Sequence, residues 1–297
     1  MALIDLLLAV LANTAWVFNF IAGKVGTAQF QPLLFTSLRF WVLLLLLLPW
    51  IRPRADQWKP LIKIGFMLGV LHFSFMFLGL HAGGDVSSVA IAAQLYVPFS
   101  ALMAALFLGE SIGAARVLGI VLAFTGVLII GFDPIVFQHL DALGYVILAS
   151  LALATATIMM KRVPQLGVLR LQAWVALVAA PCLLLLSLLF ESDQWALMSN
   201  AEIWDFWSPV YSAVAASIVG HGIVYYLLGK YPVSLTAPLM LLAPVLAVAF
   251  GVLFWNDVLT WKLIAGGAMT LMGILVINVP PRIWRRMLKK RQPPLVP

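Results

Sequence analysis

The 297-residue sequence is 64% hydrophobic, only 10% of its residues are charged, and its formal net charge is +7. Its mean hydropathy is +1.07. A soluble protein of this length needs far more charged surface, so the composition excludes a water-soluble globular protein and indicates a chain that is mostly surrounded by lipid.

Long apolar runs predict membrane-spanning α-helices, each of roughly 20 residues. A membrane β-barrel would show alternating apolarity instead, whereas runs such as 43–48 and 183–186 are unbroken. Glycine, proline and charged residues separate ten apolar runs, and the first residues lack the positive charge of a cleavable signal, so the first run is expected to stay as a helix. The predicted spans are roughly 3–22, 32–50, 61–80, 86–108, 114–132, 142–160, 168–190, 207–228, 233–254 and 261–280.

The loop charges predict the orientation of these spans. Fifteen of the 18 Lys and Arg residues fall in the loops and ends on one side, Lys24 and Lys262 fall on the other, and Arg39 lies within the second span. The positive-inside rule then places both termini in the cytoplasm of a bacterium, with the protein in the inner membrane. The basic segment 282–297 is interpreted as a cytoplasmic tail that touches anionic headgroups, and no nucleic-acid binding is expected of it.

A repeated order of residues divides the ten spans into two groups of five. At an offset close to 147 residues, an acid, a proline, a histidine and two glycines recur in the same order. The pairs are Glu110 and Asp257, Pro98 and Pro244, His72 and His221, Gly119 and Gly266, and Gly126 and Gly273. The predicted units are 1–134 and 135–281, followed by the tail. Because five is odd, the second unit enters the membrane from the opposite side, which makes an inverted repeat typical of secondary transporters.

In these features the chain resembles the EamA-type transporters of the drug/metabolite transporter superfamily. The resemblance rests on ten spans, two five-span halves, and a proline-containing helix that closes on Gly109-Glu110 before a helix with Gly-x6-Gly spacing. Overall the sequence is most similar to the YddG-type exporters of aromatic and other amino acids. The resemblance implies alternating access and a binding site formed mainly by spans one, three, four, six, eight and nine.

Polar groups in the middle of spans are the candidates for substrate binding, because they are costly in lipid. His72 and His221 either bind solute or carry a proton, or else donate to a neighbouring backbone. Pro98 and Pro244 each interrupt a span, and Pro98 is expected to free the carbonyl of Gln94. Aromatic and sulfur side chains suit ring-bearing solutes. The full predicted binding set is Trp16, His72, Met76, Gln94, Tyr96, Pro98, Thr155, His221, Tyr225 and Pro244.

The middle of the spans contains no Asp or Glu, which favours neutral or zwitterionic solutes over cationic drugs. Arg39 is expected to snorkel or to bond to carbonyls, and the glycine faces are expected to pack helices closely. The hypothesis is an amino-acid exporter that is a monomer and needs no cofactor or metal. Exporters of amphiphilic drugs or other metabolites, an intramembrane enzyme and a structural subunit of a membrane complex are the alternatives, although the sequence shows no enzyme motif.

Overall fold

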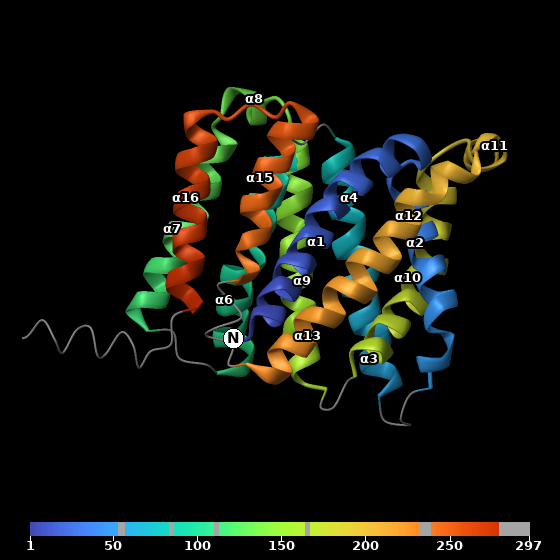
Figure 1. The fold of residues 1–297 in the computed structure, drawn as a ribbon, viewed down its shortest axis with the longest axis horizontal. Helices are drawn as coiled ribbons and strands as arrows, with labels where there is room; N and C mark the ends of the chain where they lie inside the picture. The colour runs from blue at the N-terminus through green and yellow to red at the C-terminus, as the bar shows by residue number, and fades with distance from the viewer. Residues whose placement is uncertain (53–56, 83–85, 110–112, 164–166, 232–238, 279–297) are drawn as a thin grey trace, which may run out of the picture.

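The computed structural model describes residues 1–52, 57–82, 86–109, 113–163, 167–231 and 239–278. Within these ranges every regular element is helical (Figure 1). The first half contains α1 (Leu3–Phe30), α2 (Pro32–Leu47), η1 (Leu48–Trp50), α3 (Trp58–Ile64), η2 (Gly65–His72), α4 (Phe73–His81), α5 (Val86–Ala93), α6 (Tyr96–Leu108) and α7 (Ala114–Gly131). The remainder contains α8 (Pro134–Phe137), α9 (Leu140–Lys161), α10 (Val168–Phe190), α11 (Gln194–Asn200), η3 (Ile203–Phe206), α12 (Trp207–Tyr211), η4 (Ser212–Gly220), α13 (His221–Lys230), α15 (Leu242–Trp255) and α16 (Trp261–Asn278). Glu110 and the tail 282–297 lie outside the described residues.

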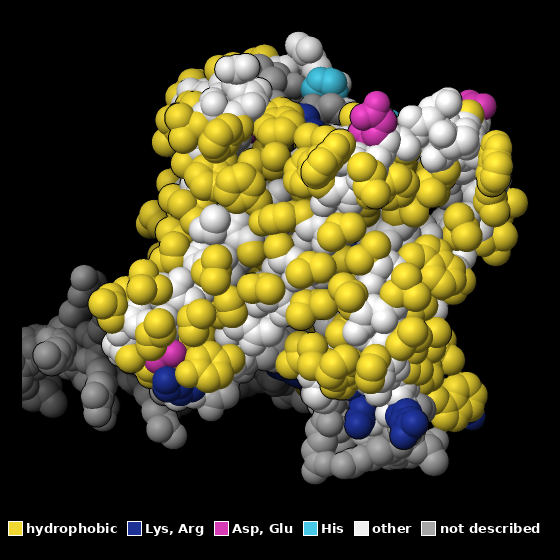
Figure 2. All heavy atoms as spheres, turned by 45° about the vertical axis from the view of Figure 1, so that its right-hand side comes forward, with side chains coloured by type: hydrophobic (Ala, Val, Ile, Leu, Met, Phe, Trp, Pro, Cys, Tyr) yellow, Lys and Arg dark blue, Asp and Glu magenta, His cyan; other side chains and the backbone are white. Residues whose placement is uncertain are grey.

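Eight helical stretches among the described residues are long and apolar enough to cross a membrane, and α15 is a shorter apolar helix. The eight coincide with eight of the predicted spans, which confirms an all-helical membrane protein. The segment from Trp207 to Lys230 is helical throughout, as α12, η4 and α13. Figure 2 shows hydrophobic side chains covering the height of one flank, with Lys and Arg gathered mainly at its lower edge. Such a belt matches the hydrocarbon of a bilayer.

The helix α1 is longer than the predicted span, which ended at residue 22. It continues to Phe30, past two glycines that were expected to break it. A Cβ atom on Gly23 would lie 2.5 Å from Cε1 of Phe77, and one on Gly26 would overlap the ring of Phe35. The helix therefore continues through both glycines. Their lack of a side chain lets α1 approach α2 and α4 closely.

The helices α1 and α9 run through the middle of the bundle (Figure 1). The helix α1 packs against η4, α13 and α15 from the second half of the chain, and α9 packs against η2, α4, α5 and α6 from the first half. Other pairs also join the halves: α2 with α10, α5 with α15, and α7 with α16. The two halves therefore pack against each other along several helices.

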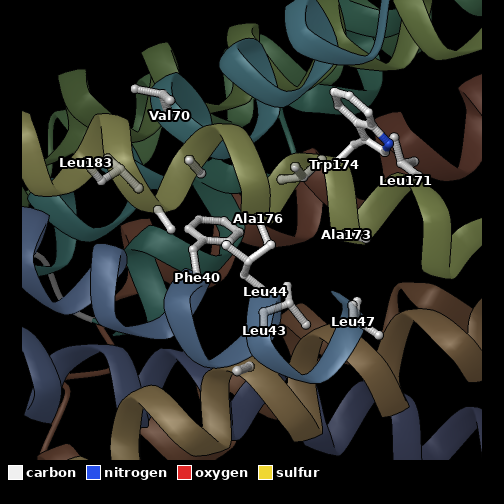
Figure 3. Close-up of a cluster of buried hydrophobic side chains, with 14 of the residues drawn as sticks. Phe40, Leu43, Leu44, Leu47, Val70, Leu171, Ala173, Trp174, Ala176 and Leu183 are labelled. Carbon is white, nitrogen blue, oxygen red and sulfur yellow. The ribbon is translucent and has the colours of Figure 1, made fainter. Parts of the chain in front are cut away.

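A cluster of buried hydrophobic side chains fills the space between α2, α10 and η2 (Figure 3). The helix α2 contributes Phe40 and Leu43, and α10 contributes Trp174 and Leu183. The indole Nε1 of Trp174 donates to the carbonyl of Ile51 at 2.7 Å, so its polar atom is satisfied as well. This packing fixes α2 against α10.

Glycines hold α7 and α16 in direct contact, as predicted. A Cβ atom on Gly119 would lie 2.7 Å from the carbonyl oxygen of Gly273, and one on Gly266 would lie 2.5 Å from that of Gly126. The glycine pairs are crossed in sequence order, so the two helices are antiparallel. These glycines serve helix packing inside the molecule.

We expect Gly119→Leu to lower the thermal unfolding temperature of the purified protein. Overpacking of a close contact costs about 1–3 kcal/mol, and here the obstructing atoms are backbone. Gly144→Ala is the matched control, because a Cβ atom at Gly144 on α9 meets nothing within 4 Å. The measurement is fluorescence-monitored unfolding in detergent. Equal unfolding temperatures for the two variants would contradict the close contact.

Candidate functional site

Two π-helical segments position the two histidines. The segment η2 ends at His72, and η4 ends at Gly220, directly before His221. The ring atom Nδ1 of His72 lies 2.9 Å from the carbonyl of Ala149, and Nδ1 of His221 lies 3.0 Å from the carbonyl of Ala216. A carbonyl only accepts, so Nδ1 carries the hydrogen and donates in both cases. In the neutral ring, Nε2 then carries the lone pair and can accept a hydrogen bond from a solute.

Trp16 from α1 lies against His221. Their ring centroids are 5.3 Å apart in an edge arrangement, and Nε1 of Trp16 donates to the carbonyl of Ala216 at 3.3 Å. The same carbonyl therefore accepts from both rings. Gly220 makes this arrangement possible, because a Cβ atom there would lie 2.7 Å from Nε1 of Trp16.

The fourth span is broken near Pro98, but the expected free carbonyl of Gln94 is not present. The helix α5 ends at Ala93 and α6 begins at Tyr96. The carbonyl of Gln94 accepts from the backbone N–H of Val97 at 3.0 Å, in a tight turn. This prediction is wrong because the chain forms a shorter-range bond where proline removes the helical one.

Side chains of the central helices contact the backbone at two helix breaks. One break separates α5 from α6, and the other is the turn directly before α15. The hydroxyl of Ser150 on α9 lies 2.9 Å from the carbonyl of Val146 in its own helix and 3.1 Å from the carbonyl of Ala93 at the end of α5. Nδ2 of Asn13 on α1 donates to the carbonyl of Leu239, just before α15, at 3.1 Å. Breaks at membrane depth are stable only when such partners exist. The breaks are thereby attached to α9 and α1.

The other predicted residues occupy different surroundings. Met76 is buried in a hydrophobic cluster that also contains Leu95 and Ala149. Tyr96 is half-buried at the start of α6. The hydroxyl of Thr155 donates within its own helix to Leu151 at 2.9 Å and lies 3.5 Å from the sulfur of Met103. Pro98 and Pro244 are buried, and the side chain of Tyr225 lies outside the described atoms.

Arg39 lies inside the bundle and does not snorkel. It is 1% exposed, and its Nη2 donates to the hydroxyl of Ser217 at 2.9 Å. Its guanidinium carbon is 4.0 Å from the ring centroid of Phe73, whose ring is next to that of His72. The predicted set omitted Arg39, although it is the single Lys or Arg that lies more than three residues from either end of a predicted span. No sequence signal marked Ser217.

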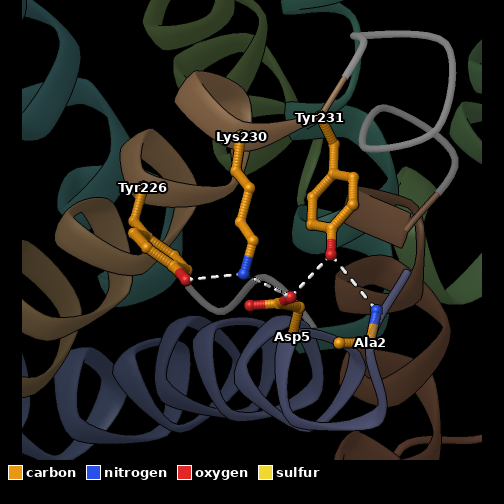
Figure 4. A network of polar contacts seen from close by, with 5 residues as sticks. All are labelled: Ala2, Asp5, Tyr226, Lys230 and Tyr231. Carbon is orange, nitrogen blue, oxygen red and sulfur yellow. Dashed lines mark hydrogen bonds and ion pairs between the residues drawn. The ribbon is translucent and has the colours of Figure 1, made fainter.

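One polar network joins α1 to the end of α13 at the face where the chain begins (Figure 4). The carboxylate of Asp5, which is fully buried, accepts from Nζ of Lys230 at 2.9 Å and from the hydroxyl of Tyr231 at 2.6 Å. The hydroxyl of Tyr226 is 3.0 Å from the same Nζ, and the backbone N–H of Ala2 donates to the hydroxyl of Tyr231. We call these five residues the N-face network.

Other polar contacts join helices at the opposite face. Asp257, after α15, accepts from the backbone N–H and the hydroxyl of Ser87 at 2.9 and 2.7 Å, which caps the start of α5. Glu191 accepts from the N–H groups of Leu33 and Leu34 at the start of α2. Both carboxylates lie at helix N-termini, where the helix dipole favours negative charge.

The side chains gathered near the centre can hydrogen-bond to a solute or stack against it. No group of three His, Cys, Asp or Glu residues in the described ranges could hold a metal ion. The centre instead offers two imidazoles, an indole and a guanidinium beside apolar rings. Such a set recognises a small solute with polar ends and an apolar body.

Comparison with known proteins decides the family. The model of the EamA-like transporter family matches residues 3–132 and 141–279. The chain belongs to the EamA-like transporter family. The expectation drawn from the sequence resemblance is therefore confirmed, and the protein is a multi-pass membrane transporter.

Two curated relatives cover nearly the whole of this EamA-family protein. A probable amino-acid metabolite efflux pump of Escherichia coli (strain K12) is 30% identical, over 96% of this chain and 98% of its own length. A protein of the same description from Salmonella typhimurium is 31% identical, over 93% and 94%. A solved crystal structure with 17% identity aligns over 97% of this chain with a TM-score of 0.64, which shows the shared fold.

We expect Gly220→Ala to reduce transport, because the added methyl group displaces the Trp16 ring from Ala216 and His221. Gly222→Ala is the control, since a Cβ atom two residues further along meets nothing within 4 Å. Solute uptake into proteoliposomes is the measurement, with protein amount per vesicle determined in parallel. Full activity of Gly220→Ala would show that the Trp16 position does not matter.

Proposed function

We propose that this EamA-family protein exports small neutral or zwitterionic amino acids, aromatic ones included, by alternating access. The observation that carries the proposal is the meeting of His72 and His221 with Trp16 and Arg39 between α1, α2, η2 and η4. The descriptions of the two curated relatives agree with an amino-acid metabolite as solute. The proposed orientation in the membrane follows from the loop charges, which favour cytoplasmic termini in the bacterial inner membrane.

The transport cycle rests on ten spans arranged as two inverted halves. Eight of these spans are the long apolar helices described above. The α12–η4–α13 segment and the helix containing α15 are proposed as the other two. The family model matches one segment in each half. Further support comes from paired features: a π segment beside each histidine, and the left-handed helix caps Gly109 and Asn256. Two such units can exchange conformations and so open the centre alternately to each face.

The chemistry of the centre favours a solute with an ammonium group and a ring. The lone pairs on Nε2 of the two histidines accept from an ammonium, and the side chain of Gln94 lies at the break between α5 and α6. Aromatic and methionine side chains such as Trp16 and Met76 contact the apolar part. An exporter of amphiphilic drugs remains the competing function, and a solute panel separates the two.

We expect proteoliposomes to exchange phenylalanine and other neutral amino acids in a counterflow assay. His72→Ala and Gln94→Ala are expected to reduce the rate about tenfold, the effect of losing roughly 1.4 kcal/mol of hydrogen bonding. Ser199→Ala on α11 serves as the control. Repeating the assay with and without a pH gradient separates proton exchange from facilitated efflux.

A panel in which no amino acid moves, with intact and correctly reconstituted protein, would refute amino-acid export. Exchange of cationic amphiphiles in the same vesicles would support the competing function. Wild-type rates in both variants would remove His72 and Gln94 from the binding site.

The N-face network is proposed as the closure of the cytoplasmic side. It joins α1 to the α13 end, and the buried Asp5 carboxylate accepts two of its hydrogen bonds. Opening this side requires α1 and α13 to separate, which breaks the contacts of Lys230 and Tyr231 with Asp5. The Asp257–Ser87 contact performs the corresponding task between α15 and α5 at the other face.

We expect Asp5→Asn to favour opening at the N-terminal face. A cysteine placed at Ala9, which is buried one turn beyond Asp5, reports the opening in a Cys182→Ala background. Its labelling by a membrane-impermeant maleimide, added from the N-terminal side, should be faster in Asp5→Asn. Asp141→Asn, at an exposed first-turn aspartate of α9, should leave the rate unchanged. Unaltered labelling in Asp5→Asn would argue against this closure.

A further inference from the structure

Arg39 is a permanent positive charge that the protein surrounds without neutralising it. A guanidinium stays protonated in proteins, and this one is 1% exposed. It lies in α2, seven residues after the helix begins at Pro32, which is about 10 Å along the helix axis at 1.5 Å per residue. An uncompensated charge at that depth is costly and marks a functional position.

The surrounding helices supply no carboxylate to balance this charge. The elements packed against α2 are α1, α4, α10, α12, η1 and η4. Their sequences contain one acid, Asp5, at the far end of α1, where it binds Lys230 and Tyr231. Among the described residues, none forms an ion pair with Arg39. The described helices around Arg39 therefore leave its charge uncompensated, and a bound solute is one candidate source of the opposite charge.

The hydrogen bonds of the guanidinium are also incomplete. Nε and Nη1 of Arg39 are buried and have no hydrogen-bond partner within the described structure. Nη2 binds the hydroxyl of Ser217, and that hydroxyl donates its own hydrogen to the carbonyl of Ser212 at 3.0 Å. Ser217 is therefore an acceptor toward Arg39, and its own hydrogen is already used, so it has none left for an anion. The free donors belong to Arg39.

The neighbours of Arg39 place these donors beside the proposed solute site. The ring of Phe73 lies under the guanidinium, and the centroids of Phe73 and His72 are 4.6 Å apart. Ser217 lies four residues before His221 and one residue after Ala216, whose carbonyl binds Trp16. A zwitterion between the histidines would thus have a cationic partner on one side and imidazole acceptors on the other.

We propose that Arg39 binds the carboxylate of the transported solute. This assignment rests on the proposed function and narrows its substrate class to solutes with a carboxylate. Contact with the aromatic rings holds the guanidinium in place without neutralising it, and the unpaired N–H groups suit carboxylate oxygens. The solute reaches Arg39 when the helices around it separate at one face.

The first test uses the unmodified protein and three matched probes. Phenylalanine carries both the carboxylate and the ammonium, phenylalaninamide lacks the carboxylate, and phenylacetate lacks the ammonium. Binding is measured as the ligand-induced shift of the unfolding temperature in detergent, in HEPES buffer that contains neither chloride nor a carboxylate. We expect phenylalanine and phenylacetate to bind at least about tenfold more tightly than phenylalaninamide, because the amide cannot form the charge-assisted hydrogen bond. Equal binding of the amide would overturn the assignment.

The second test uses Arg39→Met, with Arg52→Met as the control at an exposed arginine after η1. Arg39→Met should lose the shifts caused by phenylalanine and phenylacetate, and Arg52→Met should keep them. Without ligand, Arg39→Met should unfold at the same or a higher temperature, because it removes a buried unpaired charge. If Arg39 had only a structural role, Arg39→Met would unfold at a lower temperature than the unmodified protein. Arg39→Lys, which keeps the charge, should retain the preference for acid over amide.

The outcomes separate this inference from the proposed function. Transport of phenylalanine and phenylalaninamide at equal rates would leave amino-acid export standing and overturn the role of Arg39. Stabilisation by phenylacetate that is lost in Arg39→Met would support the assignment even if no amino acid is transported. Chloride that alone reproduces the stabilisation and displaces phenylacetate would mark a site for inorganic anions and overturn a solute carboxylate.

Discussion

The absence of water inside the bilayer is the constraint on which this structure depends. A backbone carbonyl exposed by a helix break must find a donor within the protein. Asn13 on α1 donates to the carbonyl of Leu239 before α15, and the hydroxyl of Ser150 on α9 lies within hydrogen-bond distance of the carbonyl of Ala93 at the end of α5. The breaks therefore fix α1 and α9 at the centre, and the π segments with His72 and His221 pack around them. The position of the candidate site follows from backbone satisfaction as much as from hydrophobic packing.

Much of this architecture could be read from the sequence, because lipid leaves few choices. Apolar runs bounded by charges and turn residues predicted eight helices that the structure describes. The glycine spacing predicted close helix packing, and the structure shows that α7 and α16 are the partners. The resemblance also identified the family. Polarity in a lipid-embedded helix is rare, so His72 and His221 stood out, although the pattern left open whether they bind solute or backbone. The structure shows backbone bonds through Nδ1 of each, and their role toward solute stays a prediction.

The remaining features depend on contacts that a linear pattern does not contain. The apolar periodicity did not predict the π geometry of η2 and η4. The continuation of α1 through Gly23 depends on the position of Phe77, and the turn that satisfies Gln94 depends on how α5 meets α6. Thr155 was selected for its polarity, but its hydroxyl donates to its own helix. Long cationic side chains usually reach the surface, so the sequence did not mark Arg39 as a binding residue. In the structure Arg39 is buried, and its guanidinium lies against the rings of Phe40, Phe73 and Phe77.

The antiparallel α7–α16 pair also has a consequence for biosynthesis. The hydroxyl of Thr270 on α16 donates within its own helix to Gly266 at 2.8 Å and lies 3.4 Å from the carbonyl of Ala123 on α7, 147 residues earlier in the chain. At a synthesis rate of about 5–20 residues per second, α7 enters the membrane roughly 7–30 s before its partner exists. During that interval its small-residue face has no native neighbour and is open to pairing with other helices. Correct assembly of this pair therefore depends on α7 staying unpaired until α16 emerges, which makes it a matter of timing as well as of affinity.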